Sequence, residues 1–251
     1  MQARKKGNAL GVDVSHWNYN IDWEQAKNSG ISFAFLKATE GHSIIDDYLG
    51  RNYTGCKENG LGIGLYHFMR ATTTDEAIKE ADYFIDVLDG LGGISAIDIP
   101  PVLDIEDDIG LPRGLVTSIA KTWLERVEKY YGVTPIIYSY PYFINTYFDN
   151  SLNRYPLWLA SYGTNKPDDM GGWTEWEFIQ YSDRGTVNGI GTGVDLNEYK
   201  GSVEELMNRL KVEDANKLIA ILQGLHTAGF DQEQAHYLAN EVRKAAGLPT
   251  T

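Results

Sequence analysis

The sequence has few cations, one cysteine and no long apolar run, and each shortage excludes a class of protein. With 22 Lys and Arg against 35 Asp and Glu, its net charge is -13. This charge argues against nucleic acid, whose phosphates require clustered cations, and against electrostatic capture by an anionic surface. The single Cys56 excludes an internal disulfide. No apolar stretch approaches the roughly 18 residues of a membrane-spanning helix, so we expect no membrane partner.

The first residues resemble a secretion signal in charge, but no apolar core comes after them. Residues 1–6 include Arg4, Lys5 and Lys6, and the stretch from 7 to 13 is too short and polar for a signal peptide's apolar core. We therefore expect synthesis in the cytoplasm without a signal peptide.

Short apolar segments rich in β-branched and aromatic residues recur through the first 200 residues. Several are nearly continuous apolar runs, which is typical of strands buried on both faces. Eight strands are predicted, at 9–14, 32–37, 62–68, 100–105, 134–138, 157–160, 176–181 and 193–196.

Helical patterns separate the earlier strands. They cover residues 21–29, 48–59, 74–91 and 115–131. Alternation of strands and helices predicts a parallel barrel or a doubly wound sheet. Eight strands favour the barrel, and the short Gly- and Asp-rich connections after residue 138 make it an irregular one.

The pattern changes after Lys200, where helical signals replace strands. Ser202 and Glu205 form a capping box that opens a helix toward Leu210. Two further amphipathic helices are expected, one over 214–228 followed by Gly229 and one capped by Asp231. We therefore divide the chain into a barrel domain at 1–210 and an α-helical hairpin at 211–251. Roughly 38 residues cannot bury enough surface to be stable alone, so the hairpin must dock on something.

Polar residues gather at the carboxyl ends of the predicted strands, where barrel proteins carry their functional groups. These residues are Asp13, Lys37, Glu40, Tyr66, His67, Asp104, Glu106, Tyr138, Tyr162, Gln180, Tyr181 and Asp195. A random scatter of polar residues would not favour one end so consistently.

The most informative pair is Asp104 and Glu106. Two residues apart on a strand, their side chains share one face at roughly 6.6 Å along the backbone. Glycosidases use such a pair, one carboxyl protonating the leaving oxygen and the other assisting at the anomeric carbon. Like charges at this range raise one pKa and keep that group protonated as an acid. The alternative is a solvated, acidic strand end.

Two further carboxylates should join this pair. Asp13 ends the first predicted strand and Asp195 lies on the last, and these strands are neighbours in a closed barrel. Four carboxylates around one mouth could stabilise an oxocarbenium-like transition state. A metal ion with His67 as a ligand is the other option. Because no ligand pair has the close spacing of a zinc motif, we expect no metal and no other cofactor.

An ordered series of motifs over residues 9 to 210 resembles glycoside hydrolase family 25, the Chalaropsis-type muramidases. The motifs are Gly11-Val12-Asp13-Val14-Ser15, Ile21-Asp22-Trp23, Phe35-Leu36-Lys37-Ala38-Thr39-Glu40-Gly41, Gly64-Leu65-Tyr66-His67-Phe68, Pro101-Val102-Leu103-Asp104-Ile105-Glu106, Pro135-Ile136-Ile137-Tyr138, Leu157-Trp158-Leu159-Ala160-Ser161-Tyr162 and Gly193-Val194-Asp195-Leu196-Asn197. The resemblance implies an α/β fold, a distorted (β/α) barrel with eight strands and about five helices.

The resemblance also implies a reaction and roles for its residues. The reaction is hydrolysis of the β-1,4 bond between N-acetylmuramic acid and N-acetylglucosamine in peptidoglycan. Glu106 corresponds to the acid, and Asp104 to a residue that orients the substrate's N-acetyl group or assists a water molecule. Asp13 and Asp195 correspond to the other catalytic acidic positions.

Further positions correspond to residues that bind the substrate. Those expected to do so here are Tyr66, Tyr138, Tyr162, Lys37, Glu40, His67 and Gln180. For Lys37 and Glu40, an ion pair at a strand end is an equal alternative.

The sequence departs from the family pattern at one point. The family has Trp-Gln-Tyr where this chain has Ile179-Gln180-Tyr181. This puts a stacking surface in doubt, and we expect Trp173 or Trp176 to compensate.

The expected absence of a signal peptide fits a phage endolysin that acts on the host cell wall after the membrane is opened. The hairpin at 211–251 would then serve as a wall-targeting module, a spacer or a self-association element, or simply pack on the barrel. Two alternative functions remain, a non-catalytic glycan-binding barrel and a metal-dependent hydrolase on the same fold.

Overall fold

The computed structural model describes residues 1–107, 110–211, 215, 218–220 and 232–245. The chain forms two compact units, Met1–Leu206 and Met207–Thr251. None of the helices in the described ranges is long and apolar enough to span a membrane.

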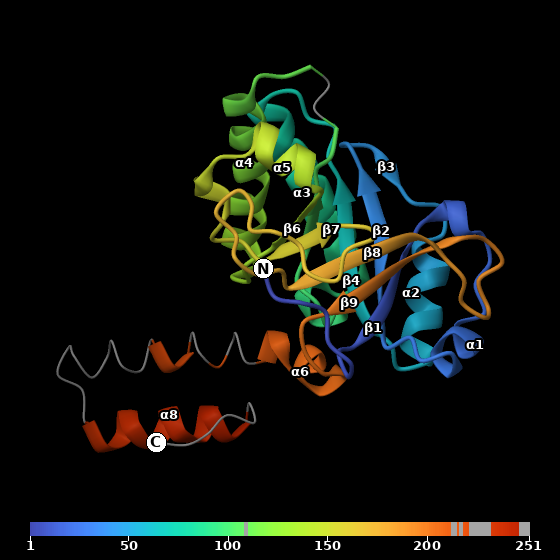
Figure 1. Ribbon diagram of the computed structural model, residues 1–251. Coiled ribbons are helices and arrows are strands. Elements are labelled where there is room, and N and C mark those ends of the chain that lie inside the picture. Colours follow the sequence, from blue (N-terminus) through green and yellow to red (C-terminus); the bar gives the residue numbers. More distant parts are fainter. Residues whose placement is uncertain (108–109, 212–214, 216–217, 221–231, 246–251) are drawn as a thin grey trace. The chain divides into compact units, whose positions relative to one another are not determined.

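The first unit is a closed barrel of eight strands (Figure 1). The strands are β1 (Leu10–Val14), β2 (Phe33–Glu40), β4 (Gly62–Phe68), β5 (Val102–Asp104), β6 (Ile136–Ser139), β7 (Leu157–Ala160), β8 (Phe178–Gly185) and β9 (Val194–Tyr199). They run in the order β1-β9-β8-β7-β6-β5-β4-β2, and β2 pairs with β1 to close the ring. A short β3 (Ile44–Ile45) pairs with the end of β2. The predicted eight-stranded barrel is confirmed.

The barrel differs from an all-parallel one at its last strand. β9 runs antiparallel to both β8 and β1. The link between β8 and β9 is only residues 186–193. A parallel crossover requires a dozen or more residues, so this link permits only a direct reversal.

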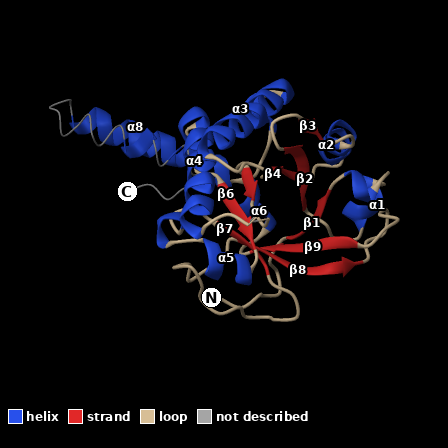
Figure 2. Cartoon of the chain, turned by 90° about the horizontal axis from the view of Figure 1, so that it is seen from above, coloured by secondary structure: helices blue, strands red, loops and turns tan. Residues whose placement is uncertain are grey.

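The helices of the first unit lie outside the barrel, and the first four follow the predicted positions within two residues at each end. The described helices of the two units are α1 (Trp23–Asn28), α2 (Leu49–Glu58), α3 (Thr74–Leu91), α4 (Arg113–Tyr131), α5 (Pro141–Tyr147), α6 (Val203–Met207) and α8 (Gln232–Ala245). Figure 1 and Figure 2 show α3, α4 and α5 grouped on one side of the barrel and α1 and α2 on another. The short α5 had no predicted counterpart.

An aromatic cluster fills the barrel interior. Phe35 stacks on Trp158 with ring centroids 4.0 Å apart, and Phe33 and Phe178 pack edge-on around them. Glycines make room for these rings, since a Cβ on Gly64 would lie 2.5 Å from the Phe35 ring. Because the interior is filled, a substrate can bind only at a mouth of the barrel.

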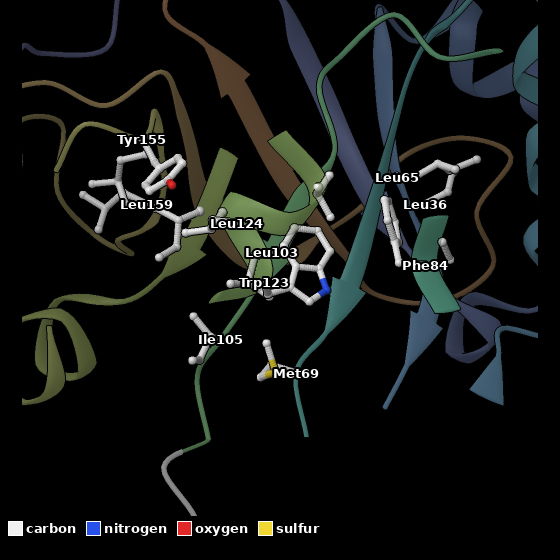
Figure 3. Packing of buried hydrophobic residues seen from close by; sticks show 14 of the residues in the cluster. Leu36, Leu65, Met69, Phe84, Leu103, Ile105, Trp123, Leu124, Tyr155 and Leu159 are labelled. Atoms are coloured by element: carbon white, nitrogen blue, oxygen red, sulfur yellow. The ribbon is translucent and has the colours of Figure 1, made fainter. Parts of the chain in front are cut away.

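A second apolar layer joins the strands to the outer helices, and it orients β5. Leu103 and Ile105 point into this layer beside Trp123 of α4 (Figure 3). Side chains alternate along an extended strand, so the residues between them face the other way. Val102 lies in the inner cluster, and Asp104 and Glu106 are therefore directed to the interior and its mouth.

The predicted capping box at Ser202 is confirmed. Ser202 N donates to Glu205 Oε2 (2.7 Å), and Glu205 N donates to Ser202 Oγ (3.2 Å). Beyond it, residues 215 and 218–220 are helical, and α8 corresponds to the second predicted hairpin helix. Most of the predicted helix 214–228, with Gly229 and Asp231, lies outside the described residues.

Candidate active site

Four carboxyl side chains meet at one mouth of the barrel. Asp13 on β1 lies directly across the sheet from Asp195 on β9, as paired Cα positions. Asp104 ends β5, and Glu106 follows two residues later. Because β9 runs in reverse, Asp195 reaches this mouth from the start of its strand, whereas Asp13 and Asp104 reach it from the ends of theirs. Asp13 and Asp104 are 9% and 7% exposed, and Glu106 and Asp195 are more open.

Two amide side chains hold Asp13. Gln180 Nε2 donates to Asp13 Oδ2 at 2.9 Å, and Asn197 Nδ2 donates to the same oxygen at 2.6 Å. The orientation of the Asn197 amide follows from Trp158, whose indole N–H can only donate, and the Gln180 oxygen accepts from a tyrosine hydroxyl. Trp158 Nε1 donates to Asn197 Oδ1 (2.8 Å), and Tyr138 donates its hydroxyl to Gln180 Oε1 (3.1 Å).

The tyrosines continue this network to the surface. Tyr162, half exposed, also donates its hydroxyl to Gln180 Oε1, at 2.6 Å. Tyr66 is buried, and the pKa of its phenol lies well above the ordinary value because of burial and the charges of Asp13 and Asp104. Burial and neighbouring carboxylates, including Asp104, likewise raise the pKa of Tyr138. Both phenols therefore remain protonated donors.

Lys37 and Glu40 form the predicted ion pair at the end of β2, with Nζ and Oε2 2.6 Å apart. Lys37 is 9% exposed, and its charge acts on both Asp104 and Glu106. The pair thus lies beside the acidic cluster, and its contact with a substrate stays a prediction.

His67 is the predicted site residue that the structure places elsewhere. It is fully buried on the helix side of β4, stacked on Trp123 with centroids 5.5 Å apart. Burial lowers its pKa, so the ring is neutral, with Nε2 donating to Glu80 (2.9 Å) and Nδ1 accepting from Thr39 (2.8 Å). Tyr66 faces the interior, and the next residue on a strand must face outward. His67 therefore faces the helices and not the mouth where it was expected.

The metal hypothesis named His67 as a possible ligand beside the carboxylates. Both of its ring nitrogens are used, and within the described ranges no three His, Cys, Asp or Glu side chains are grouped to hold a metal ion.

The surroundings of the four carboxyl groups raise their pKa values, so these groups hold protons at a higher pH than usual. Burial raises the pKa of Asp104 well above its ordinary value, and the charges of Glu106 and Asp13 add to this. Burial also raises the pKa of Glu106, helped by Asp195 and Asp107 and opposed by Lys37 and Arg70.

The pair formed by Asp13 and Asp195 behaves similarly. The pKa of Asp13 is raised well above its usual value by burial and then by Asp195, although the bonds from Asn197 and Gln180 lower it. Burial raises the pKa of Asp195 too. Four acids that resist ionisation together can supply both a proton and negative charge at one place.

Sequence reasoning missed two polar residues of this site. Asn197, two residues beyond Asp195 on β9, shares its face of the strand, and that spacing could have revealed it. Arg70 follows β4 in a loop, bonded to Glu40 (2.9 Å) and Asp107 (3.0 Å), and no pattern marks it.

Ile179, which stands where the family pattern has tryptophan, does not line the mouth of the barrel. Ile179 is buried in the outer layer against the helices, and its neighbour Gln180 is the residue that faces Asp13. Trp173 and Trp176 are buried too and donate to the backbone of Tyr155 and Gln2. The expected compensation by these tryptophans was therefore wrong, because position 179 does not form part of the mouth.

Comparison with known proteins now decides the family. Residues 12–190 match the profile of Glycosyl hydrolases family 25. The chain belongs to this family. YegX of Escherichia coli K12 is 40% identical over 201 residues, which cover 78% of this chain and 71% of YegX. Lysozyme M1 of Streptomyces globisporus is 35% identical over 208 residues, covering 78% of this chain and 69% of the lysozyme.

A solved structure agrees with the profile. The crystal structure of the bacterial lysozyme from Streptomyces coelicolor superposes with a TM-score of 0.71 at 31% identity, covering 81% of this chain and 97% of that one. The resemblance seen in the motifs is thereby confirmed, and with it a glycoside hydrolase of the muramidase type.

Proposed function

We propose that this family 25 enzyme hydrolyses the β-1,4 bond between N-acetylmuramic acid and N-acetylglucosamine, with Glu106 as the general acid. The observation that carries this assignment is the position of Glu106. It is the more open member of the Asp104–Glu106 pair, and burial and nearby carboxylates raise its pKa. A group that protonates a leaving oxygen must both reach the glycosidic bond and retain a proton near neutral pH.

Asp104 suits a positioning role. It lies deeper than Glu106, and within the described part of the chain its Oδ1 has no hydrogen-bond partner. A buried carboxylate oxygen without a partner is costly, and a substrate N–H or a water would satisfy it. We propose that Asp104 accepts from the substrate's acetamide, or holds the attacking water, while Glu106 protonates the leaving group.

Asp13 and Asp195 can share one proton between them and place one negative charge at the same mouth. The two amide donors fix Asp13 in place, so its field is preorganised before the substrate arrives. An oxocarbenium-like transition state develops positive charge at the anomeric carbon, which this field stabilises. Tyr138 and Tyr162 line the approach, with their hydroxyls tied to Gln180.

Replacement of Glu106 by Gln tests the assignment. We expect E106Q to fold normally and to lose at least roughly a hundredfold in the rate of wall lysis, because the amide cannot donate the proton. Mass spectrometry of wall digests made by the unaltered enzyme should show reducing muramic acid ends.

The matched control is E125Q, on the exposed face of α4. It should lyse walls at the normal rate. Near-normal lysis by E106Q would remove Glu106 from the mechanism, and reducing glucosamine ends would mean that a different bond is cut.

We also propose that the protein is made in the cytoplasm and acts as a phage endolysin on the host wall. The family supports the wall as substrate, and the endolysin role stays a proposal. Glycan binding without catalysis has no observation in its favour.

A further inference from the structure

We propose that Arg70 is a positioning residue that controls the charge around Glu106 through its contact with Asp107. The inference rests on the proposed function, in which Glu106 is the acid. Arg70 lies just beyond β4, and Asp107 directly follows Glu106 in the sequence. The two side chains pair with Arg70 Nη1 and Asp107 Oδ2 3.0 Å apart.

The backbone beneath Arg70 is fixed from two sides. Arg70 N donates to Glu80 Oε2 at 3.0 Å, and Glu80 is a buried residue of α3. The preceding Met69 N donates to the carbonyl of Asp104 at 2.9 Å. Arg70 therefore starts from a rigid position tied to the strand that carries the catalytic pair.

The side chain of Arg70 connects the ends of two strands. Its Nε donates to Glu40 Oε1 at 2.9 Å, so the guanidinium bridges Glu40 at the end of β2 and Asp107 after β5. The guanidinium also lies over the Phe68 ring, 4.5 Å from its centroid. Such a planar fork holds two carboxylates in a fixed relation, which a lysine could not do.

The arrangement has an electrostatic consequence for Glu106. The charge of Asp107 raises the pKa of Glu106, and the charges of Arg70 and Lys37 lower it. Pairing with Arg70 therefore offsets the acid that lies beside Glu106 in the sequence. The charged and titratable groups that face Glu106 are Asp195 from β9, Asp104 and Asp107 from the β5 segment, Lys37 from β2, Arg70 after β4, Tyr138 from β6 and Tyr162 after β7.

The test uses two substitutions that should act in opposite directions. A general acid works only while protonated, so the basic limb of the pH–rate profile follows the pKa of Glu106. In R70Q the charge of Asp107 is no longer offset, and the limb should move up by roughly half to one pH unit. In D107N it should move down by a similar amount, and R70K should lie between R70Q and the unaltered enzyme.

The matched control is R126Q, which breaks the ion pair of Arg126 with Asp82. That pair is as exposed as Arg70–Asp107 and joins two outer helices, so the basic limb should stay in place. The second readout is carbon-13 NMR titration of the Glu106 carboxyl without substrate in the same variants, which does not depend on activity.

The outcomes separate the two claims. If R70Q and D107N lose activity without opposite shifts of the basic limb and of the NMR titration, Arg70 is merely structural and the inference is overturned. If E106Q still lyses walls, the proposed acid is wrong, while the NMR titration still decides whether Arg70 sets the pKa of Glu106. Opposite shifts in both readouts support the inference.

Discussion

Asp104, for which we propose a positioning role in the reaction, should lower the stability of the folded protein. It is buried, faces other carboxyls, and has one oxygen without a partner in the described ranges. Its pKa is raised on folding, so the folded state holds more protons than the unfolded state once the pH exceeds the ordinary value. Stability therefore falls as the pH rises through this range.

We predict that D104N is more stable than the unaltered enzyme at pH 7, because the amide needs no proton to remain neutral. The melting temperature should rise by roughly 2–4 °C, the effect of about 1 kcal/mol in a domain of this size. At pH 4 the difference should nearly vanish, since the carboxyl is then protonated. Wall lysis should fall at least about a hundredfold.

Calorimetry at the two pH values checks this prediction. A melting temperature that is unchanged or lower at pH 7 would show that Asp104 carries no electrostatic cost.

Residue-level prediction succeeded where alternation and topology were sufficient. Asp104 and Glu106 are two residues apart, and strand alternation therefore put both side chains on one face. Closure of the barrel between its first and last strands put Asp13 beside Asp195. The same rule, applied strictly, directs His67 to the helix side once Tyr66 is assigned to the interior. Arg70 could not be found, because its role depends on contacts with β2 and the β5 segment that no local pattern encodes.

Among the elements, the strands were predictable because the barrel is buried on both faces and each strand contains a short, nearly continuous apolar run. Strand direction was not, because apolar periodicity is the same in either direction. The short link before β9 is the feature that sets its reversal. The aromatic cluster inside the barrel could not be predicted from the sequence either, because it depends on which strands become neighbours.

We predict that F35A destabilises the barrel by about 3–5 kcal/mol, the cost of a large cavity in a fixed core. Phe35 contacts Trp158, Phe33 and Phe178, and rigid strands surround all four rings, so collapse into the space is limited. Guanidinium denaturation measures the loss.

Y142A is the control, because Tyr142 is 66% exposed and its removal should cost less than about 0.5 kcal/mol. If F35A and Y142A lose the same free energy of unfolding, the aromatic cluster does not stabilise the barrel as we predict.

At the scale of the whole molecule, the first unit ends at a residue that belongs to its own core. Leu206, at the end of the first unit, is fully buried within the inner cluster, and the described residues beyond it belong to the second unit. The hairpin's expected roles in wall targeting, spacing or self-association remain predictions.

We predict that a chain ending at residue 210 folds and retains hydrolysis of purified walls. A chain ending at residue 201 loses Leu206 and should be less stable by about 2–4 kcal/mol. Thermal melts compare the two, and light scattering compares their mass with that of the full chain. If the chain ending at residue 210 does not fold, the division into a barrel domain and a hairpin is contradicted. If the full chain is a monomer, self-association through the hairpin is contradicted.

The reversal of β9 also bears on how the enzyme is made. β1 leaves the ribosome before the other strands of the barrel, yet its Asp13 acquires its partner only when Asp195 has been translated. Pairings so distant in sequence form late in folding. A polypeptide interrupted between β5 and β9 contains Asp13, Asp104 and Glu106 but lacks Asp195, and its ring of strands cannot close through β9. We therefore expect wall hydrolysis to begin only when β9 joins the sheet, so that a product terminated before β9 should not hydrolyse the wall of the cell that makes it.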